Sequence, residues 1–125
     1  MVAFPKKVRD AWDNHEGPGV LATVSKDGIP NIIYVSCASL YGDDRVVVAD
    51  NYFDKTRKNI QAGSKAAFLF LDKQGKSYQV KGTLEYHKEG KLFEQMKAEN
   101  PPEHPGHAAA VLCVEEAYSG SEKLC

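Results

Sequence analysis

Residues 78–86 alternate between two kinds of side chain, and this alternation constrains the fold more than any other feature of the sequence. Apolar or small residues occupy every second position, namely Tyr78, Val80, Gly82, Leu84 and Tyr86. The positions between them are polar, namely Gln79, Lys81, Thr83 and Glu85. Because successive side chains of a β-strand point to opposite faces, the pattern predicts a long strand with one face in a core and one polar face.

Such a strand needs partners, and the sequence supplies candidates. Five further segments have the apolar patterns of strands, at 19–25, 29–36, 45–50, 66–71 and 108–115. Asp27 and Gly28 form a hairpin turn, since glycine supplies the positive φ that a tight turn requires. Pro30 cannot donate a hydrogen bond to a neighbour, so the beginning of its strand is expected at a sheet edge or a bulge. Short helices are expected at 4–15, 54–62 and 89–99. Together these elements predict a mainly β chain with short helices, folded as a six-stranded antiparallel barrel with helices over its openings.

Composition limits the organisation and the classes of partner. A chain of 125 residues that is 42% hydrophobic has enough apolar surface for one core, so we expect a single domain over 1–118 and a loosely held polar tail over 119–125. The 16 basic and 17 acidic residues give a net charge of -1, which argues against a nucleic-acid or membrane-surface binder. No apolar run reaches the roughly 20 residues of a membrane span. Three cysteines without a CxxC spacing suit reduced thiols, so a cytoplasmic location is expected.

With a balanced net charge, any anion site must be local, and residues 45–60 are the best candidate. There a valine-rich strand leads into a helix whose first turn carries Lys55 and Thr56. Backbone N–H groups and the positive end of the helix dipole gather at such a start, which favours a phosphate group. The alternative is that Lys55, Arg57 and Lys58 form only a solvated basic face.

Three segments carry a resemblance to a known family: 19–30, 45–60 with its Asp-Lys-Thr-Arg-Lys-Asn-Ile, and 78–83. Their order and spacing resemble the pyridoxamine-phosphate oxidase-like, FMN-binding split β-barrels, in particular the short stand-alone members. The resemblance implies a split β-barrel that binds FMN as a homodimer, with each flavin at the subunit boundary.

The resemblance also implies roles for individual residues. It places Lys55 and Thr56 at the FMN phosphate, supported by Asn59 one turn further on. The residues implied to line the ribityl chain and the flavin edge are Ala49, Asp50 and Asn51. The second-strand residues implied to run alongside the isoalloxazine are Tyr34, Val35 and Ser36. Gln79 is implied to contact flavin, often across the dimer interface.

The expected function is a redox role, as a small flavin-dependent oxidoreductase or an electron carrier that a nicotinamide or another small molecule reduces. The sequence departs from full pyridoxamine-phosphate oxidases in two ways, which argue against that reaction. It lacks their basic and aromatic C-terminal substrate segment, and Ile33 stands where the family carries a second phosphate-binding arginine. The alternative is a non-catalytic split-barrel module for another ligand, such as haem or deazaflavin. No catalytic side chain and no metal site is predicted; His104 and His107 indicate a surface turn, with a metal pair as the lesser alternative.

Overall fold

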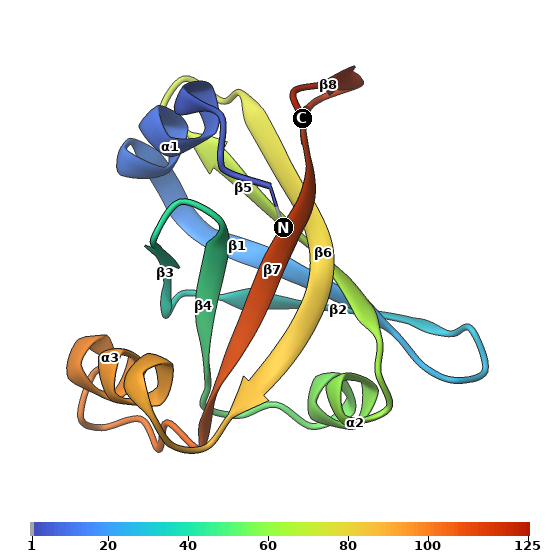
Figure 1. The fold of residues 1–125 in the computed structure, drawn as a ribbon, viewed down its shortest axis with the longest axis vertical. Coiled ribbons are helices and arrows are strands. Elements are labelled where there is room, and N and C mark those ends of the chain that lie inside the picture. The colour runs from blue at the N-terminus through green and yellow to red at the C-terminus, as the bar shows by residue number, and fades with distance from the viewer. Residues whose placement is uncertain (1) are drawn as a thin grey trace.

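Eight strands form one antiparallel sheet in the computed structural model, which describes residues 2–125 (Figure 1). The strands are β1 (His15–Val24), β2 (Pro30–Val35), β3 (Ala38–Tyr41), β4 (Arg45–Asp50), β5 (Lys65–Asp72), β6 (Ser77–His87), β7 (Ala108–Ser119) and β8 (Glu122–Lys123). Their order is β2-β1-β5-β6-β7-β4-β3, and β8 pairs with β7. The mainly β, antiparallel class predicted from the sequence is confirmed.

The two ends of this sheet are consecutive in the chain, because only residues 36 and 37 separate β2 from β3. The sheet must therefore curl until its ends come near each other. Within residues 2–125, however, β2 pairs only with β1 and β3 only with β4. The barrel thus stays open along one seam, between the end of β2 and the β3–β4 hairpin.

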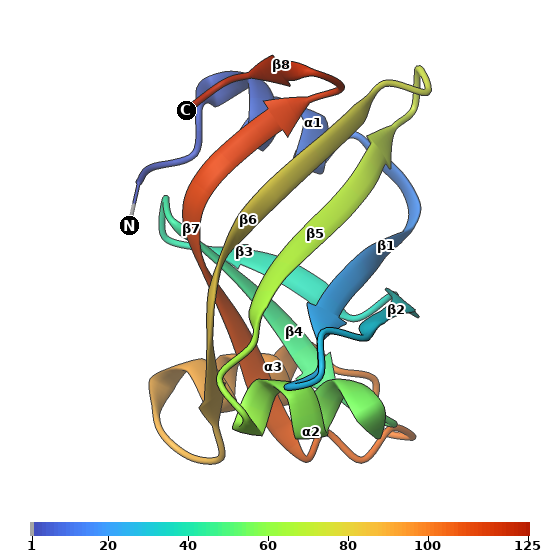
Figure 2. The ribbon, with the colours of Figure 1, turned by 90° about the vertical axis from the view of Figure 1, so that its right-hand side faces the viewer.

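Three short helices cover the ends of the curled sheet (Figure 2). They are α1 (Lys6–Asp13), α2 (Lys55–Gln61) and α3 (Lys91–Glu99). Figure 2 shows α1 at one end and α2 and α3 at the other. In the part of the chain that the structure describes, no helix is long and apolar enough to cross a membrane.

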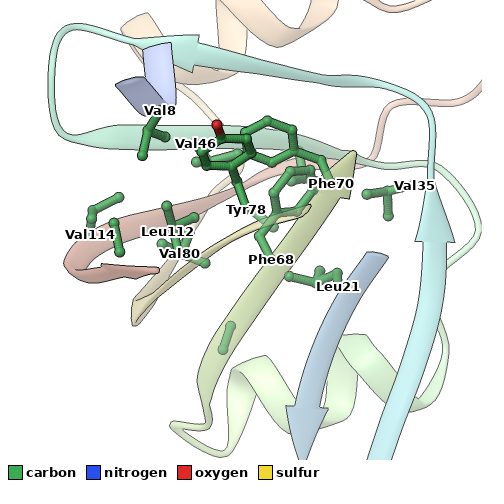
Figure 3. Close-up of a cluster of buried hydrophobic side chains, with 14 of the residues drawn as sticks. Val8, Leu21, Val35, Val46, Phe68, Phe70, Tyr78, Val80, Leu112 and Val114 are labelled. Atoms are coloured by element: carbon green, nitrogen blue, oxygen red, sulfur yellow. The ribbon is translucent and has the colours of Figure 1, made fainter. Parts of the chain in front are cut away.

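The core fills the inside of the curl with large side chains from several strands (Figure 3). Among its fully buried members are Val8, Leu21, Phe68, Val80 and Leu112. Trp12 of α1 packs on it, with its ring 5.2 Å from that of Phe70 and 5.8 Å from that of Phe68. The amphipathic helix predicted near the N-terminus therefore packs its half-buried tryptophan against the barrel.

One close approach inside the sheet requires glycine. Gly82 lies where the pairing of β6 with β7 shifts register. A Cβ atom at this position would lie 1.9 Å from the carbonyl oxygen of Cys113. The register shift brings the two backbones too close for any side chain, which explains the glycine in the otherwise regular alternation of β6.

The strands differ from the prediction in several places, and β7, for example, runs to Ser119 rather than to residue 115. β1 begins at His15, because a register shift between Glu16 and Val20 lets the strand continue past Gly17. The four residues of β3 form an additional strand against β4. Residues 119–125 are held rather than loose: β8 pairs with β7, and the backbone N–H of Leu124 donates to the carbonyl of Ala117 at 2.7 Å. The added strands are short and irregular in pattern, so periodicity did not indicate them.

Candidate functional site

A cleft of about 320 Å³ lies at the open seam of the barrel; we call it the seam cleft. Its walls are the end of β2, the end of β4, the loop that leads into α2, and His104. Seven of the predicted site residues line it, namely Tyr34, Val35, Ser36, Ala49, Asn51, Lys55 and Thr56. The link between β2 and β3 is bonded to the end of β4, because the backbone N–H of Ala49 donates to the carbonyl of Cys37 at 2.9 Å. The fold therefore brings together residues from two segments that are about twenty positions apart.

Asp50 lies behind the cleft, with a fully buried side chain. Its carboxylate accepts hydrogen bonds from Arg57 Nε at 2.7 Å and Nη2 at 2.9 Å. It accepts two more, from the hydroxyl of Tyr86 at 2.5 Å and the backbone N–H of Phe53 at 3.1 Å. Because Phe53 and Arg57 stand on either side of the start of α2, Asp50 anchors the loop and the helix that carry the cleft residues.

The electrostatics of this buried group follow from its contacts. Burial alone would raise the pKa of Asp50, but the hydrogen bonds from Arg57, Tyr86 and Phe53 outweigh it, and the pKa lies below its usual value. The hydrogen bond to Asp50 raises the pKa of Arg57. Burial, together with the same carboxylate, raises the pKa of Tyr86. At neutral pH the group is therefore a carboxylate held by a guanidinium and a neutral phenol.

Lys55, Arg57 and Lys58 at the start of α2 have different surroundings. These surroundings test the alternative that the three residues form only a solvated basic face. Arg57 is occupied by Asp50, and its side chain is 32% exposed. Lys58 lies 3.6 Å from Asp54 in an exposed pair. Lys55 alone of the three lines the seam cleft, and no other Lys or Arg of the described chain does so. The cleft thus holds one cation at its α2 end.

Thr56 stands beside Lys55 with a nearly completely buried side chain. Its hydroxyl oxygen accepts a hydrogen bond from the Asn31 side-chain amide at 2.9 Å. The hydroxyl hydrogen remains available to a ligand, since an accepting hydroxyl can still donate. Asn31, from the start of β2, therefore ties the edge strand to α2 and orients this donor.

Besides Asp50, two other predicted residues, Asn59 and Gln79, lie outside the seam cleft within one protomer. Asn59 is buried, and its amide donates to the hydroxyl of Thr23 at 3.0 Å. It lines a neighbouring hollow of about 620 Å³, between α2 and the β1–β2 hairpin, to which Lys55 also contributes. Gln79 lies on the outer face of β6, opposite Leu69 of β5. The structure therefore does not bring Gln79 to the cleft of its own chain.

The segment after α3 forms a wall of the cleft that sequence reasoning missed. Asn51 and Asn100 exchange two side-chain hydrogen bonds, at 2.9 and 3.1 Å. The Tyr52 hydroxyl lies 3.1 Å from Nδ1 of His104. The two histidines near residue 105, interpreted above mainly as a surface turn, thus belong to a loop that is fastened to the cleft. The only sequence signal for it was the cluster of proline, glycine and histidine.

Comparison with known proteins places this geometry in a family. A family model described as pyridoxamine 5'-phosphate oxidase matches residues 4–119. The chain belongs to this family. Membership of the pyridoxamine 5'-phosphate oxidase family confirms the resemblance that the sequence motifs indicated.

Individual relatives agree with this placement. An uncharacterized protein of Methanocaldococcus jannaschii is 35% identical over 104 residues, which cover 79% of this chain and 70% of the relative. An FMN-binding protein of Syntrophomonas wolfei superposes with a TM-score of 0.80 at 25% identity, covering 93% of this chain and 85% of that one. HupZ of Group A Streptococcus gives a TM-score of 0.79 at 26% identity, over 95% of this chain and 94% of that one. The fold is thus a split β-barrel, and the family and its neighbours fit a barrel that binds a flavin or another ligand.

Proposed function

We propose that this chain binds FMN in the seam cleft and has a redox role, as a small flavin-dependent oxidoreductase or an electron carrier. The observation that carries the proposal is that one cleft combines a cation and a hydroxyl donor, Lys55 and Thr56, with the end of β2 and with Ala49. Family membership and the similarity to an FMN-binding protein support it.

The residues of the cleft fit the parts of this cofactor. Lys55 supplies a point charge for the phosphate, and Thr56, oriented by Asn31, supplies a hydroxyl donor. Val35 and Ala49 offer small apolar surfaces to a planar ring, while Asn51 lies between the two ends. A bound flavin supplies the hydride and electron transfer, and the protein supplies binding, orientation and electrostatics. Because Ile33 stands in place of a second arginine, Lys55 and Thr56 carry the phosphate contacts.

We also propose that the protein functions as a homodimer, because its outer sheet face is apolar and uncovered. Four side chains on this face, the apolar patch, are exposed: Ile32 (68%), Tyr34 (79%), Leu69 (40%) and Leu71 (46%). The strand register makes them neighbours, since Tyr34 and Leu69 both lie opposite Val20. Contiguous exposed apolar residues of this kind mark association sites. A symmetric pair, the commonest arrangement, would cover the patch of both copies.

Dimerisation gives Gln79 its proposed role. Gln79 lies directly opposite Leu69, at the margin of the apolar patch. Tyr34 belongs both to the patch and to the seam cleft. A second copy seated on the patch therefore brings its Gln79 towards the region of the cleft. This arrangement gives Gln79, which lies outside the cleft of its own chain, a place at the ligand.

Spectroscopy tests the proposed cofactor directly. The purified protein should show the paired absorption bands of flavin, or gain them and quench flavin fluorescence when FMN is added. The combined variant Lys55→Ala, Thr56→Ala removes two charge-assisted contacts of about 1.5 kcal/mol or more each, so FMN affinity should fall about 100-fold. Lys73→Ala is the matched control, because Lys73 is exposed in the β5–β6 turn at the α1 end of the barrel (Figure 2).

Three results would contradict the proposal. The first is a protein that neither contains nor binds FMN. The second is a sharp Soret band, or binding of a deazaflavin in preference to FMN, which would favour the alternative ligands. The third is unchanged FMN affinity in the double variant, which would remove Lys55 and Thr56 from the site.

A further inference from the structure

A second cavity adjoins the seam cleft on the side away from Lys55; we call it the α3 hollow. It has a volume of about 380 Å³ and lies between the C-terminal end of α3 and the outer face of β3 and β4. It shares Ser36, Cys37, Ala49 and His104 with the seam cleft. A molecule in the α3 hollow would therefore contact whatever occupies the cleft.

Charge is distributed unevenly along this row of cavities. The hollow beyond the other end of the cleft is lined by Lys26, Lys55 and Lys58. Within the described residues, no Lys or Arg lines the α3 hollow, and its one carboxylate is that of Glu99. A phosphate-bearing ligand would therefore place its anionic part at the lysine end. The α3 hollow disfavours anions and is left for an uncharged group.

The walls of the α3 hollow combine apolar side chains with a few polar ones. Val47, Met96 and Pro101 supply apolar surface, and the side chain of Met96 is 4% exposed. Asn100 also lines the hollow, but its amide is already engaged in the two hydrogen bonds with Asn51. The wall it forms is therefore fixed rather than available to a ligand.

The polar groups that remain available can donate hydrogen bonds to a ligand. Ser36 and Ser39 bring hydroxyl groups to the hollow, and His104 reaches it with Nδ1 already beside the Tyr52 hydroxyl. Hydroxyl and imidazole N–H groups match a ligand that accepts hydrogen bonds, such as a carbonyl compound. Concave sites with mostly apolar walls and a few polar groups are typical of small-molecule binding, and the volume lies at the lower end of their range.

We propose that the α3 hollow binds a small uncharged carbonyl compound next to the seam cleft. This inference names a substrate class for the proposed flavoprotein, and so it rests on the proposed function. Glu99 and the absence of basic residues would disfavour anionic ligands, and the serine hydroxyls would bind the carbonyl oxygen. Phosphate-bearing parts of ligands belong to the lysine end of the row of cavities.

Two probes of one shape and different charge test the inference. They are 2-acetylnaphthalene, which is neutral, and 2-naphthoate, which carries a carboxylate in the same position. We expect the neutral probe to bind the FMN-saturated protein at least about fivefold more tightly in calorimetry. In ¹H–¹⁵N spectra it should shift the amides of Ser36, Cys37 and Ser39 while leaving those of Ile32 and Leu69 of the apolar patch unchanged.

Two variants locate the binding. Ser39→Trp fills the hollow from β3 without touching the cleft, since Ser39 lines only the former. It should weaken 2-acetylnaphthalene at least about tenfold and leave FMN affinity within about twofold. Glu99→Gln keeps the test valid if Ser39→Trp fails to fold, because Glu99 is exposed and its replacement does not disturb packing. It should reduce the preference for the neutral probe over 2-naphthoate.

The outcomes separate the two proposals. Equal affinity for the two probes, amide shifts confined to the apolar patch, or unchanged probe binding in the folded Ser39→Trp variant would each overturn the α3 hollow as the site. Probe binding in the hollow by protein that does not bind FMN would support the hollow and refute the proposed function. FMN binding without probe binding would support the proposed function and refute the α3 hollow as a binding site.

Discussion

Replacing Arg57 with methionine tests whether the buried carboxylate of Asp50 anchors the start of α2. The substitution keeps an unbranched side chain that can still pack on its neighbours, but it removes two of the four hydrogen bonds that Asp50 accepts. Breaking a fully buried ion pair by removing one partner costs about 3–5 kcal/mol. Since the Arg57 side chain is 32% exposed, water can partly replace it. We therefore expect a loss of about 2–3 kcal/mol in the free energy of unfolding.

The loss should depend on pH, and its sign follows from the pKa of Asp50. In the native protein this pKa is lowered, so the carboxylate contributes stability that is present above the unfolded value of about 3.9 and is lost as the pH falls through the folded value. Without Arg57, the pKa of Asp50 loses the hydrogen bond that lowers it most, while burial still raises it, so the folded pKa is higher in the variant than in the native protein. The stability deficit of the variant should therefore shrink as the pH falls towards the unfolded value of about 3.9.

Urea denaturation followed by the fluorescence of Trp12, the single tryptophan, measures both effects at a fixed protein concentration. At about 4 °C per kcal/mol for a domain of this size, the melting temperature should fall by about 8–12 °C. Lys58→Met is the control, because Lys58 and Asp54 form an exposed pair worth less than about 1 kcal/mol. An Arg57→Met protein as stable as the control, or a deficit that stays constant with pH, would refute the anchoring role.

Three further substitutions test the fold and the proposed association. Gly82→Ala should cost about 3 kcal/mol or more in chemical denaturation, because the new methyl group meets the carbonyl oxygen of Cys113 at 1.9 Å; a near-neutral effect would show that the sheet can widen there. Leu69→Lys should leave the monomer folded by circular dichroism and shift the native mass from dimer to monomer in light scattering, whereas a dimer that persists would place the interface elsewhere. Asn100→Ala should lower the free energy of unfolding by about 1–2 kcal/mol and weaken FMN binding, since Asn51 loses its two side-chain hydrogen bonds and keeps only the one from the backbone N–H of Gly106; unchanged FMN affinity would show that the wall is not needed by the ligand.

The fold could be predicted wherever a pattern was local and regular. The alternation around Tyr78 indicated a long inner strand, and its buried and outward faces are as expected. Gly28 has the positive φ of 82° that its hairpin turn requires, and Pro30 begins an edge strand. The extension of β1 past Gly17 was not predictable, because proline and glycine normally end an element and only a register shift with β5 accommodates them.

The candidate site also contains residues that the sequence could indicate and residues that it could not. Lys55 and Thr56 lie in one short segment, so their neighbourhood is visible in the sequence. Asn51 and Asn100 are 49 residues apart, and no local pattern indicates that their amides pair. Asp50 was assigned from the resemblance to the flavin edge, and the structure places its side chain behind the cleft; its partner Tyr86 lies on another strand. Long-range polar contacts of this kind have no periodicity by which a single sequence could reveal them.

The position of Tyr34, shared between the seam cleft and the apolar patch, makes ligand binding and self-association thermodynamically linked in the proposed dimer. If a second protomer improves the site, bound ligand must strengthen the dimer by the same factor. Dilution would then lower the apparent affinity for the cofactor even though no residue changes. The amount of protein in the cell would thus set how much of it carries flavin.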